Sequence, residues 1–495
     1  MTHLFLYGPP GTGKSTIGRL LAKSLQLPFV DLDRIIETNA GMSIPQIMEQ
    51  RGETAFRDME TAALKSLTAE KENVVALGGG ALLREENRAC AETNGKILLL
   101  MAELPILLDR VQREPGKRPL LAGDLKNKLA ALLEKRKEHY ASFPLQLQVD
   151  GKPVEQNARE AQIKLGRHRL SAMGEYDVIV GQVSNLPAAD LIITDENVAK
   201  HHLEKFNGIK SVVIPAGEEH KNLQTVSRLW SAFLENGLDR KSVVIALGGG
   251  VVGDLTGFAA SAYMRGIEWI GIPTTLLSMV DASLGGKTGF DLPEGKNLIG
   301  SFHPPKRVIA DPSLLLTLTA RELRSGMAEV VKHGIISSPD LFAMCRRGMD
   351  WVKANLEEVV KHALAVKIKI IEEDPYEKGF RAALNLGHTV GHAVELVSRF
   401  ELRHGEAIAI GMIVEAKYSA RVGLASQSAV EAIESTLEAL GLPTRIPENM
   451  PREEIIRAMR VDKKKNAKSI RFALPVEIGK VELVNVEDLE AVIGE

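Results

Sequence analysis

The segment "HLFLYGPPGTGKST" (residues 3–16) joins a short apolar run to a glycine-rich loop, and a helical pattern follows it. The loop contains the pattern Gly8-x4-Gly13-Lys14-Ser15. In a strand–loop–helix context, glycines let backbone N–H groups approach phosphates, Lys14 reaches the outer phosphates, and the Ser15 hydroxyl binds Mg²⁺. The segment therefore predicts a P-loop domain that binds a nucleotide, and it leaves the phosphoryl acceptor open.

The loop sequence GPPGTGK also resembles that of AAA+ motor ATPases. Those proteins need an acidic pair at the end of a hydrophobic strand to hold Mg²⁺ and activate water. The later strand expected here, "KILLLMAEL" (96–104), carries only Glu103 beyond its apolar run. The sequence therefore favours small-molecule phosphoryl transfer over a motor function.

Length and composition set the outer limits. A chain of 495 residues is too long for one compact core, so we expect two or three domains. A net charge of −2 argues against a dedicated surface for nucleic acid or for an anionic membrane. The two cysteines, Cys90 and Cys345, are far apart and argue against a disulfide framework. Because no apolar run has transmembrane length and the N-terminus does not resemble a signal peptide, we expect a cytoplasmic enzyme.

Acidic and basic residues follow the P-loop in a recurring order. In "FVDLDRIIE" (29–37), Asp31 and Asp33 stand two residues apart at an expected strand end, where both would face the same side. One carboxylate can support the Mg²⁺ shell, and the other can accept a hydrogen bond from an acceptor hydroxyl. Arginines in "GETAFRDME", "GKRPLL" and "LLEKRKEHY" offer planar, bidentate contacts to carboxylates and phosphates.

The ordered set Asp-x-Asp, FRxxE, GGG, RPLL and RxxxY resembles the shikimate kinase family over residues 1–166. The resemblance implies a parallel sheet flanked by helices, ATP with Mg²⁺ as the phosphoryl donor, and shikimate as the acceptor. It implies ATP contacts at Gly11, Thr12, Gly13, Lys14, Ser15, Thr16, Arg110 and Arg118, shikimate contacts at Asp33, Arg57, Gly78, Gly79, Gly80 and Arg136, and Mg²⁺ contacts at Ser15 and Asp31.

The resemblance also implies roles. Arg57 and Arg136 would clamp the carboxylate of shikimate, while Asp33 would help to deprotonate the attacking hydroxyl. Arg118 would lie on a lid over the transferring phosphoryl group, and Lys14 would complete the catalytic set. The residue near adenine is Arg110 or its neighbour Arg113, and another small P-loop kinase of the gluconate or nucleotide type stays as the alternative.

The chain then changes character. Residues 154–166 indicate a closing helix followed by a glycine, and a new strand pattern begins at about residue 167. Residues 167–320 alternate short apolar strands with helical patterns, which predicts a parallel α/β sheet. Residues 321–495 have mostly helical periodicity, which predicts an all-α domain.

Two similar segments, "VVALGGG" (74–80) and "VVIALGGG" (243–250), each consist of an apolar strand pattern followed by glycines. Their similarity raises the question of an internal repeat. The residues after each segment diverge at once, so the chain is not a duplication. The second segment opens Gly248-x-Gly250-x-x-Gly253, which fits a dinucleotide fingerprint between a strand and a helix. Because Asp254 follows immediately and the usual ribose-binding acid is missing, a variant scheme of dinucleotide binding is favoured over the standard one.

The helical part carries a metal signal. "LNLGHTVGHAVE" places His388 and His392 at i and i+4 on one helix face, and "RHGEAIAIGM" adds His404. "GMAEVVKHG" adds Glu329. Three or four such ligands favour a Zn²⁺ site with an open position, and the missing Glu of HExxH argues against a metalloprotease.

Several basic and amide residues occur in glycine-rich or apolar segments of the sequence, and as a group they suggest an anionic substrate with phosphate and carboxylate groups. These residues are Arg265, Lys287, Lys296, Asn297, Lys332, Arg381, Asn385, Lys463 and Lys464.

Five motifs occur in order at residues 248–266, 273–289, 295–305, 325–334 and 384–393. In this order they resemble the 3-dehydroquinate synthase family over about residues 168–490, so the whole chain resembles a fusion of two shikimate-pathway families. The resemblance implies Glu329, His388 and His404 as ligands of Zn²⁺ or Co²⁺. It implies substrate contacts at Asp281, Lys287, Asn297, Lys332, Arg381, Asn385, His392 and Lys463 or Lys464, with Arg265 lent by a partner subunit of a homodimer. It implies NAD contacts at Asp195, Asn197, Glu218, Lys221, Gly249, Gly250, Val251, Asp254, Thr274, Thr275, Lys287, Lys296, Thr317 and Glu322.

The implied reaction converts 3-deoxy-D-arabino-heptulosonate 7-phosphate to 3-dehydroquinate and phosphate, with NAD⁺ reduced and reoxidised within one turnover. The resemblance assigns catalytic roles to Lys287, Lys332, Arg381 and His392. A metal-dependent polyol dehydrogenase is the alternative, although it would not need the cations at 287, 332 and 381. A regulatory fusion with one decayed half is disfavoured because neither motif set has a gap.

Overall fold

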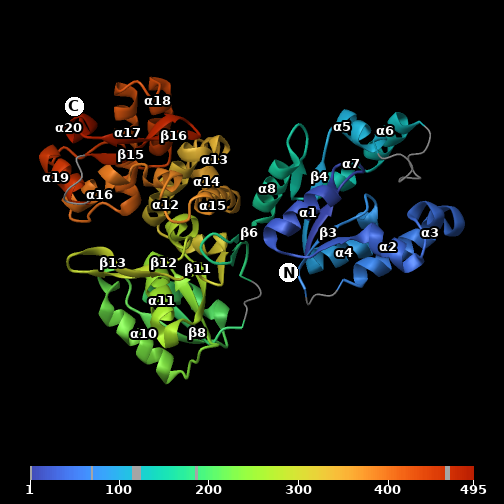
Figure 1. Ribbon diagram of the computed structural model, residues 1–495, viewed down its shortest axis with the longest axis horizontal. Coiled ribbons are helices and arrows are strands. Elements are labelled where there is room, and N and C mark those ends of the chain that lie inside the picture. Colours follow the sequence, from blue (N-terminus) through green and yellow to red (C-terminus); the bar gives the residue numbers. More distant parts are fainter. Residues whose placement is uncertain (1–2, 68–70, 114–123, 184–187, 463–468, 495) are drawn as a thin grey trace. The chain divides into compact units, whose positions relative to one another are not determined.

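The computed structural model describes residues 3–67, 71–113, 124–183, 188–462 and 469–494. The chain divides into two compact units, Met1–Arg169 and Leu170–Glu495. Figure 1 shows both units. Among the described helices, none is long and apolar enough to cross a membrane.

Within the described part of the smaller unit, five strands form a parallel sheet in the order β2-β3-β1-β4-β5. The strands are β1 (His3–Tyr7), β2 (Phe29–Asp31), β3 (Asn73–Ala76), β4 (Gly95–Met101) and β5 (Gln146–Gln148). The helices are α1 (Lys14–Leu25), α2 (Leu32–Ala40), α3 (Ile44–Lys65), η1 (Ala81–Leu83), α4 (Glu85–Asn94), α5 (Leu104–Gln112), α6 (Leu125–Lys135), α7 (Lys137–Ala141) and α8 (Val154–Leu165).

Central strand β1 is buried on both faces, as a continuous apolar run in a parallel sheet predicts. Its side chains alternate between two cores. Leu4 and Leu6 pack with residues of α1 and α8, whereas Phe5 and Tyr7 pack with residues of α2, α3 and α4. Tyr7 therefore points to the side on which the acceptor site is expected.

The loop after β1 has the conformation of a P-loop. Gly8, Gly11 and Gly13 have positive φ angles of 139°, 87° and 84°. A Cβ on Gly8 would overlap the carbonyl oxygen of Leu100, so this position requires glycine. Helix α1 begins at Lys14, which confirms the predicted strand–loop–helix order.

One local prediction in this unit is wrong. Strand β2 ends at Asp31, and Asp33 lies in the first turn of α2, not on the strand. The two carboxylates are therefore not related by strand alternation. The closing helix is confirmed, since α8 ends at Leu165 and Gly166 caps it with a left-handed φ of 63°.

In the larger unit, the described strands of the main sheet follow the order β6-β7-β14-β11-β10-β8-β9. The strands are β6 (Arg167–Leu170), within which the unit boundary falls, β7 (Tyr176–Val180), β8 (Leu191–Asp195), β9 (Lys210–Ile214), β10 (Val243–Gly248), β11 (Glu268–Pro273) and β14 (Arg307–Ala310). The pairs β7–β14, β14–β11, β11–β10, β10–β8 and β8–β9 are parallel, which confirms the predicted α/β sheet.

Both faces of this sheet are covered. Leu191 and Ile193 of β8 pack with α10 and α11, and Ile192 packs on the opposite face with the core that includes α12 and α15. The accompanying helices are α9 (Glu196–His202), η3 (Leu203–Phe206), η4 (Glu218–His220), α10 (Leu223–Glu235), α11 (Gly250–Ala262), η5 (Tyr263–Arg265), η6 (Ser278–Ala282) and η7 (Pro312–Thr317). An antiparallel hairpin of β12 (Lys287–Leu292) and β13 (Gly295–Phe302) follows η6.

The remainder is mostly helical, as predicted. Its helices are α12 (Ala320–Ser337), α13 (Pro339–Cys345), α14 (Met349–Ala354), α15 (Leu356–Glu373), η8 (Phe380–Asn385), α16 (His388–Val397), α17 (His404–Arg421), α18 (Gln427–Ala439), α19 (Arg452–Asp462) and α20 (Leu489–Ile493). This part is not all-α as predicted, because it also contains a second antiparallel hairpin, β15 (Ile470–Glu477) with β16 (Lys480–Val486).

Candidate active sites

The P-loop of the smaller unit holds its own polar side chains close to the backbone. Lys14 Nζ donates to the carbonyl oxygens of Gly8 (2.8 Å) and Pro9 (3.0 Å). The Ser15 hydroxyl donates to Asp31 Oδ2 at 2.8 Å, which brings together the two predicted Mg²⁺ contacts. An alcohol and a carboxylate at this distance fit a hard cation that prefers oxygen ligands.

Two arginines were candidates for the adenine side. Arg110 lies against the P-loop, donating to Gly11 O at 3.4 Å and to Val149 O at 3.3 Å. Arg113 is exposed and pairs with Asp109 at 2.7 Å, one turn away on its own helix. The predicted lid residue Arg118 lies outside the described residues.

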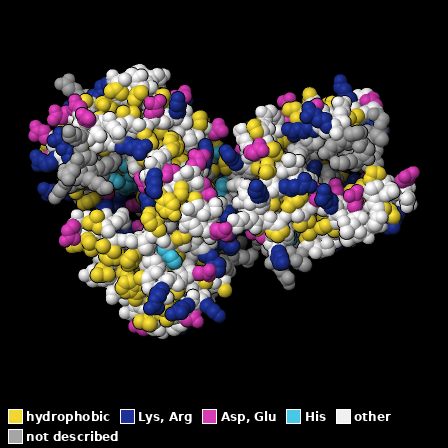
Figure 2. Space-filling view, viewed as in Figure 1, with side chains coloured by type: hydrophobic (Ala, Val, Ile, Leu, Met, Phe, Trp, Pro, Cys, Tyr) yellow, Lys and Arg dark blue, Asp and Glu magenta, His cyan; other side chains and the backbone are white. Residues whose placement is uncertain are grey.

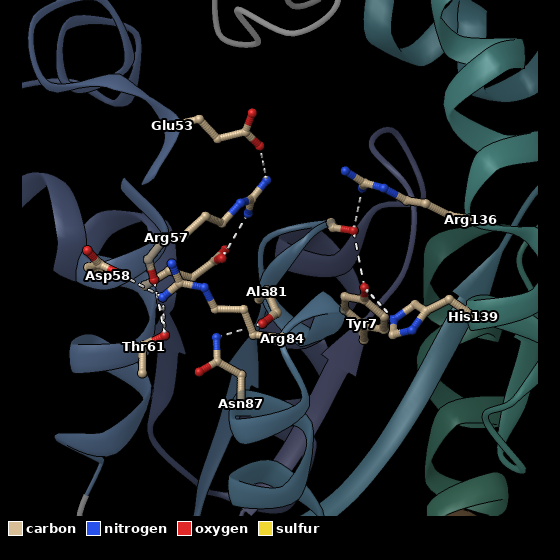
Figure 3. A network of polar contacts seen from close by, with 12 residues as sticks. Tyr7, Glu53, Arg57, Asp58, Thr61, Ala81, Arg84, Asn87, Arg136 and His139 are labelled. Atoms are coloured by element: carbon tan, nitrogen blue, oxygen red, sulfur yellow. Dashed lines mark hydrogen bonds and ion pairs between the residues drawn. The ribbon is translucent and has the colours of Figure 1, made fainter. Parts of the chain in front are cut away.

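The predicted acceptor residues come together around the glycine turn after β3. A Cβ on Gly80 would lie 2.8 Å from both Nη atoms of Arg57, and one on Gly78 would lie 3.0 Å from Asp33 Oδ1. Arg136 Nη1 donates to Gly79 O at 2.7 Å. Figure 3 shows the two arginines on opposite sides of this turn. The absence of side chains on the turn thus allows a carboxylate and two guanidinium groups to approach one small space.

Glu60 is a further residue of this site, to which the sequence analysis gave no role. It is 1% exposed, accepts from Arg57 Nη1 at 2.8 Å, and lies beside Gly78. The signal was present in the FRxxE spacing, because residues three apart share a helix face. Glu53, one turn earlier, holds the other Nη of Arg57 at 3.2 Å.

The electrostatics of this space suit proton transfer. Burial, and secondarily the charge of Asp31, raise the pKa of the Asp33 carboxyl to about 6, although Lys14 opposes the shift. A carboxyl with a pKa near the working pH can accept a proton from a hydroxyl and release it again.

In the larger unit, the glycine turn after β10 lies at the carboxyl edge of the parallel sheet, where nucleotides bind in open α/β folds. It begins α11 at Gly250, which confirms the predicted strand–turn–helix order. A pocket at this turn is lined by Gly248, Gly249, Gly250, Gly253, Asp254, Pro273, Ser278, Lys287 and several apolar residues. A Cβ on Gly250 would have its nearest neighbour 3.7 Å away, so bare backbone faces available space there.

The other predicted nucleotide contacts are distributed around this edge. Lys221 is buried and pairs with Asp254 at 2.7 Å, and it also donates to Asn297 Oδ1 at 2.6 Å. Asp195 caps α9 by accepting from the backbone N–H of Asn197 at 2.9 Å. Burial raises the pKa of the Glu218 carboxyl, while Lys221 opposes the shift.

Four more predicted nucleotide contacts lie on η7 and α12 or directly after β11. Thr274 follows β11 directly and donates its backbone N–H to Gly248 O at 3.0 Å, and Thr275 Oγ1 accepts from the Ser278 N–H at 3.1 Å. Thr317 lies on η7 against His202 (2.8 Å), and Glu322 lies on α12 and pairs with Arg403 (3.4 Å).

The helical part brings three predicted metal ligands together from three helices. Glu329 of α12 is fully buried, and its Oε1 lies 3.6 Å from His388 Nε2 and 3.5 Å from His404 Nε2. The Nδ1 atom of His388 faces Leu386 O at 3.1 Å, and that of His404 faces Glu395 Oε2 at 3.4 Å. When Nδ1 carries the proton, the lone pair on each Nε2 points to the shared centre. One carboxylate and two imidazoles fit a catalytic zinc site with an open position.

His392 packs edge-on against His388, with ring centroids 5.2 Å apart, and at a tilt against His404 at 5.8 Å, so it contacts both predicted metal-ligand histidines. Its place one turn along α16 confirms the predicted shared helix face with His388.

A pocket of about 570 Å³ extends from these helices to the β12–β13 hairpin. Figure 2 shows histidine side chains inside a hollow on the visible face of this unit. The pocket gathers most of the predicted substrate residues, namely Asp281, Lys287, Asn297, Lys332, Arg381 and Asn385, together with the predicted metal ligand His388. Arg265 is exposed on η5, and Lys463 and Lys464 lie outside the described residues.

Two pocket residues were missed by the sequence analysis. Lys367 of α15 is 6% exposed and donates to the backbone oxygen and to Oδ1 of Asp281, both at 2.6 Å. Burial opposes ionisation of Asp281, but Lys367 and Lys332 hold its pKa below the ordinary value. Glu377 pairs with Lys287 at 2.9 Å. The available signal for Lys367 was its position on the buried face of a helix.

Three family models match successive parts of the chain. Family models match for shikimate kinase at residues 10–165, for the N-terminal part of 3-dehydroquinate synthase at residues 211–325, and for its C-terminal part at residues 326–465. The 3-dehydroquinate synthase of Nostoc punctiforme is 41% identical over 327 residues, which cover 63% of this chain and 90% of the relative. That of Synechococcus is 44% identical over 347 residues, which cover 67% and 93%.

Two solved structures are similar to one unit each. The structure of 2-deoxy-scyllo-inosose synthase with carbaglucose-6-phosphate, NAD⁺ and Co²⁺ has a TM-score of 0.60 at 28% identity, covering 66% of this chain and 99% of that one. Shikimate kinase from Acinetobacter baumannii in complex with shikimate is 34% identical over 32% of this chain and 90% of its own, with a TM-score of 0.31. The chain belongs to the 3-dehydroquinate synthase family and carries, ahead of that part, a domain of the shikimate kinase family.

Proposed function

We propose that the smaller unit of this fused shikimate-pathway enzyme phosphorylates shikimate with ATP, and that the larger unit converts 3-deoxy-D-arabino-heptulosonate 7-phosphate to 3-dehydroquinate and phosphate. The observation that carries the second activity is a cluster of three side chains suited to hold a metal ion, at a pocket lined by cations. The polyol dehydrogenase alternative would need the metal and the nucleotide but not Lys287, Lys332 and Arg381.

In the kinase reaction, bound Mg²⁺ supplies charge neutralisation on the ATP phosphates. Ser15 and Asp31 would hold that ion, the backbone of residues 11–16 would contact the phosphates, and Lys14 would bind the outer ones. Arg110 would lie near the adenine, and the family resemblance assigns Arg118 to the transferring group. The chain's contribution is therefore positioning and charge stabilisation.

On the acceptor side, Arg57 and Arg136 pair with the shikimate carboxylate through planar guanidinium groups. Asp33 hydrogen-bonds the ring hydroxyls and takes the proton of the attacking one, which its pKa of about 6 supports. The backbone of Gly78–Gly80 lines the wall between these groups. Glu60 holds Arg57 in place from the buried side.

In the synthase reaction, a bound Zn²⁺ or Co²⁺ would supply acidification of a substrate hydroxyl, and a bound NAD⁺ would supply a reversible hydride acceptor. Glu329, His388 and His404 would hold the metal. We assign the nucleotide to the glycine turn with Asp195, Asn197, Glu218, Lys221, Gly249, Gly250, Val251, Asp254, Thr274, Thr275, Lys287, Lys296, Thr317 and Glu322.

The substrate's anionic groups determine the remaining roles. Lys287, Lys332 and Arg381 neutralise the phosphate and carboxylate. The remaining proposed substrate contacts are Asn297, Asn385, Asp281, His392 and Lys463 or Lys464. Because phosphate loss requires removal of a neighbouring proton, cations that stabilise the developing charge lower that barrier. The missed residue Lys367 belongs to this cationic wall and orients Asp281.

We further propose a cytoplasmic homodimer formed through the larger unit, in which Arg265 reaches the pocket of a second copy. Its exposure on η5 supports this role. Analytical ultracentrifugation tests the dimer, and a monomer with full synthase activity would contradict it.

One assay separates the main proposal from its alternative. The protein is given heptulosonate phosphate with NAD⁺ and Zn²⁺, and inorganic phosphate and NADH absorbance are followed together. We expect phosphate to accumulate without net NADH. If NADH rises in proportion to product, the larger unit is a dehydrogenase. The kinase proposal is tested separately by ADP formation that depends on shikimate.

A further inference from the structure

The carbonyl oxygen of Gly79 is contacted by three side-chain donors. Arg136 Nη1 donates to it at 2.7 Å, the Tyr140 hydroxyl at 3.1 Å and the Tyr7 hydroxyl at 3.3 Å. Tyr7 comes from the end of β1, while Tyr140 lies on α7 and Arg136 immediately precedes that helix, as Figure 3 shows in part. Since a carbonyl oxygen has two lone pairs, three donors saturate this acceptor and fix its direction.

Fixing this carbonyl also fixes the next N–H group. The peptide between Gly79 and Gly80 is planar and trans, so the Gly80 N–H points opposite to the Gly79 carbonyl. A Cβ on Gly80 would lie 2.8 Å from both Nη atoms of Arg57, so the Gly80 backbone lies close to this guanidinium. Without side chains, two adjacent glycines would otherwise let this peptide plane rotate readily. The direction of one backbone donor beside Arg57 therefore depends on what holds the carbonyl.

Tyr7 has a second partner that determines the direction of its single proton. Its hydroxyl oxygen lies 3.1 Å from His139 Nε2. Gly79 O can only accept, so when the Tyr7 proton points to it, the His139 contact must use an Nε2–H donor. Burial, together with Arg88 and Arg136, lowers the pKa of His139, which favours a neutral ring with one N–H. The chain His139 → Tyr7 → Gly79 then has one consistent direction.

The contacts of the Tyr7 ring explain why the hydroxyl is held there. The ring packs edge-on against His139 and Tyr140, with centroids 5.8 Å apart in each case, and against Phe143 at 5.3 Å. It is fully buried. The hydroxyl is thus a buried polar group whose described partners are one backbone carbonyl and one imidazole, and both lie at the acceptor site.

We propose that Tyr7 and His139 are positioning residues for the phosphoryl acceptor, because they hold the Gly79–Gly80 peptide so that its N–H is presented to the acceptor beside Arg57. The inference rests on the proposed kinase function and adds two residues to it. Neither residue touches the acceptor or the reacting atoms. Their effect is on acceptor binding and not on the nucleotide.

The test compares steady-state kinetics of the full-length protein and of Tyr7→Phe, which keeps the packed ring and removes only the hydroxyl. Losing one hydrogen bond of ordinary strength predicts a rise of about five-fold in KM for shikimate. We expect KM for ATP to stay unchanged. This split is informative because Tyr7 directly precedes Gly8 of the P-loop, so general disturbance of β1 would raise both KM values.

Variants of the second residue keep the inference testable if Tyr7→Phe folds poorly. His139→Gln retains an N–H donor near Nε2 and should stay close to wild type. His139→Leu removes the donor and should raise KM for shikimate by about two-fold, a fraction of one hydrogen bond. Ser142→Ala is the matched control, since Ser142 bonds to the backbone of His139 and to Arg88 without touching Gly79.

The outcomes are distinct. Unchanged KM for shikimate in Tyr7→Phe, or parallel rises for both substrates, would overturn the inference while leaving the kinase assignment intact. Equal effects of His139→Gln and His139→Leu would overturn the part assigned to His139. If the wild-type protein does not phosphorylate shikimate at all, the proposed function itself fails.

Discussion

His404 Nε2 lies 3.5 Å from Glu329 Oε1, although 75 residues separate the two along the chain. The other nitrogen of the same ring faces Glu395 Oε2, and Glu395 Oε1 in turn accepts from Lys296 Nζ at 3.3 Å. One carboxylate therefore connects a predicted metal ligand with a predicted nucleotide contact on the β12–β13 hairpin.

Replacing Glu395 with Gln should weaken zinc binding. The carboxylate orients the His404 ring, and loss of such an outer partner typically costs 10- to 100-fold in metal affinity, so we expect about that loss here. Competition with a chromophoric chelator measures it. Glu401→Gln is the control, because that side chain is exposed nearby on the same segment. Equal zinc affinity of Glu395→Gln and wild type would contradict the orienting role.

Removing the metal should abolish the activity of the larger unit and leave the kinase activity of the smaller unit intact. After dialysis against a strong chelator, phosphate release from heptulosonate phosphate should be lost and should return with added Zn²⁺ or Co²⁺. Shikimate phosphorylation, assayed with fresh excess Mg²⁺, should persist because the P-loop uses oxygen ligands from the other unit. Full phosphate release after stringent metal removal would refute the metal assignment.

The two arginines of the acceptor site should differ in their effect on stability. Arg57→Ala leaves Glu60 buried without its cation, which should cost about 3 kcal/mol in unfolding free energy. Arg136 donates to a backbone oxygen that retains two tyrosine donors. Arg136→Ala should therefore lower the unfolding free energy less than Arg57→Ala does. Both should raise KM for shikimate much more than KM for ATP. Urea unfolding and steady-state kinetics measure the two effects.

The double variant Arg57→Ala/Glu60→Gln provides the matched comparison. It removes the buried charge together with its partner, so it should regain most of the lost stability without regaining shikimate affinity. If it is no more stable than Arg57→Ala, the cost does not come from the unpaired carboxylate.

Asp33 should make stability depend on pH in a defined direction. Its folded-state pKa of about 6 is above that of an ordinary carboxyl, mainly through burial. Its stabilising contribution is therefore fully present at low pH and is lost as pH rises through about 6. Asp33→Asn should raise the Tm of the smaller unit at pH 8 more than at pH 5, while abolishing phosphorylation.

Thermal scans at the two pH values check this difference. Asp58→Asn serves as control, because Asp58 is 65% exposed and pairs only at the surface with Arg84. A Tm increase for Asp33→Asn that is equal at both pH values would show that ionisation of Asp33 is not its origin.

Gly250→Ala should separate nucleotide binding from stability. A Cβ there meets Ala282 only at 3.7 Å, so the protein tolerates it, and alanine favours the start of α11. The same methyl group would enter the pocket in which we propose that bare backbone approaches the diphosphate of NAD⁺. We expect unchanged or higher Tm and strongly weakened NAD⁺ binding in fluorescence titration. Unchanged NAD⁺ affinity of Gly250→Ala would show that the nucleotide does not bind at this turn.

The sequence by itself determined the features that depend on neighbouring residues. The P-loop, the glycine turn before α11 and the closing helix α8 were all predicted in place, because strand, turn and capping chemistry act over a few residues. The same local reasoning misplaced Asp33, since β2 stops at Asp31 and the helix starts one residue later. It also missed the β15–β16 hairpin, which pairs across a short turn and packs against α17 within a mostly helical region.

Tertiary structure decided which residues meet. The residue types at 329, 388 and 404 suggested a metal, but only the packing of α12, α16 and α17 brings their ligand atoms within 4.8 Å of one another. Gly405, next to His404, makes that crossing possible, because a Cβ there would overlap the backbone oxygen of Ser325 on α12.

The same holds for Lys367 with Asp281 and for Tyr7 with His139, which are 86 and 132 residues apart in sequence. No local pattern encodes such pairs. They result from burial, which brings distant polar groups together because a buried donor or acceptor without a partner is costly.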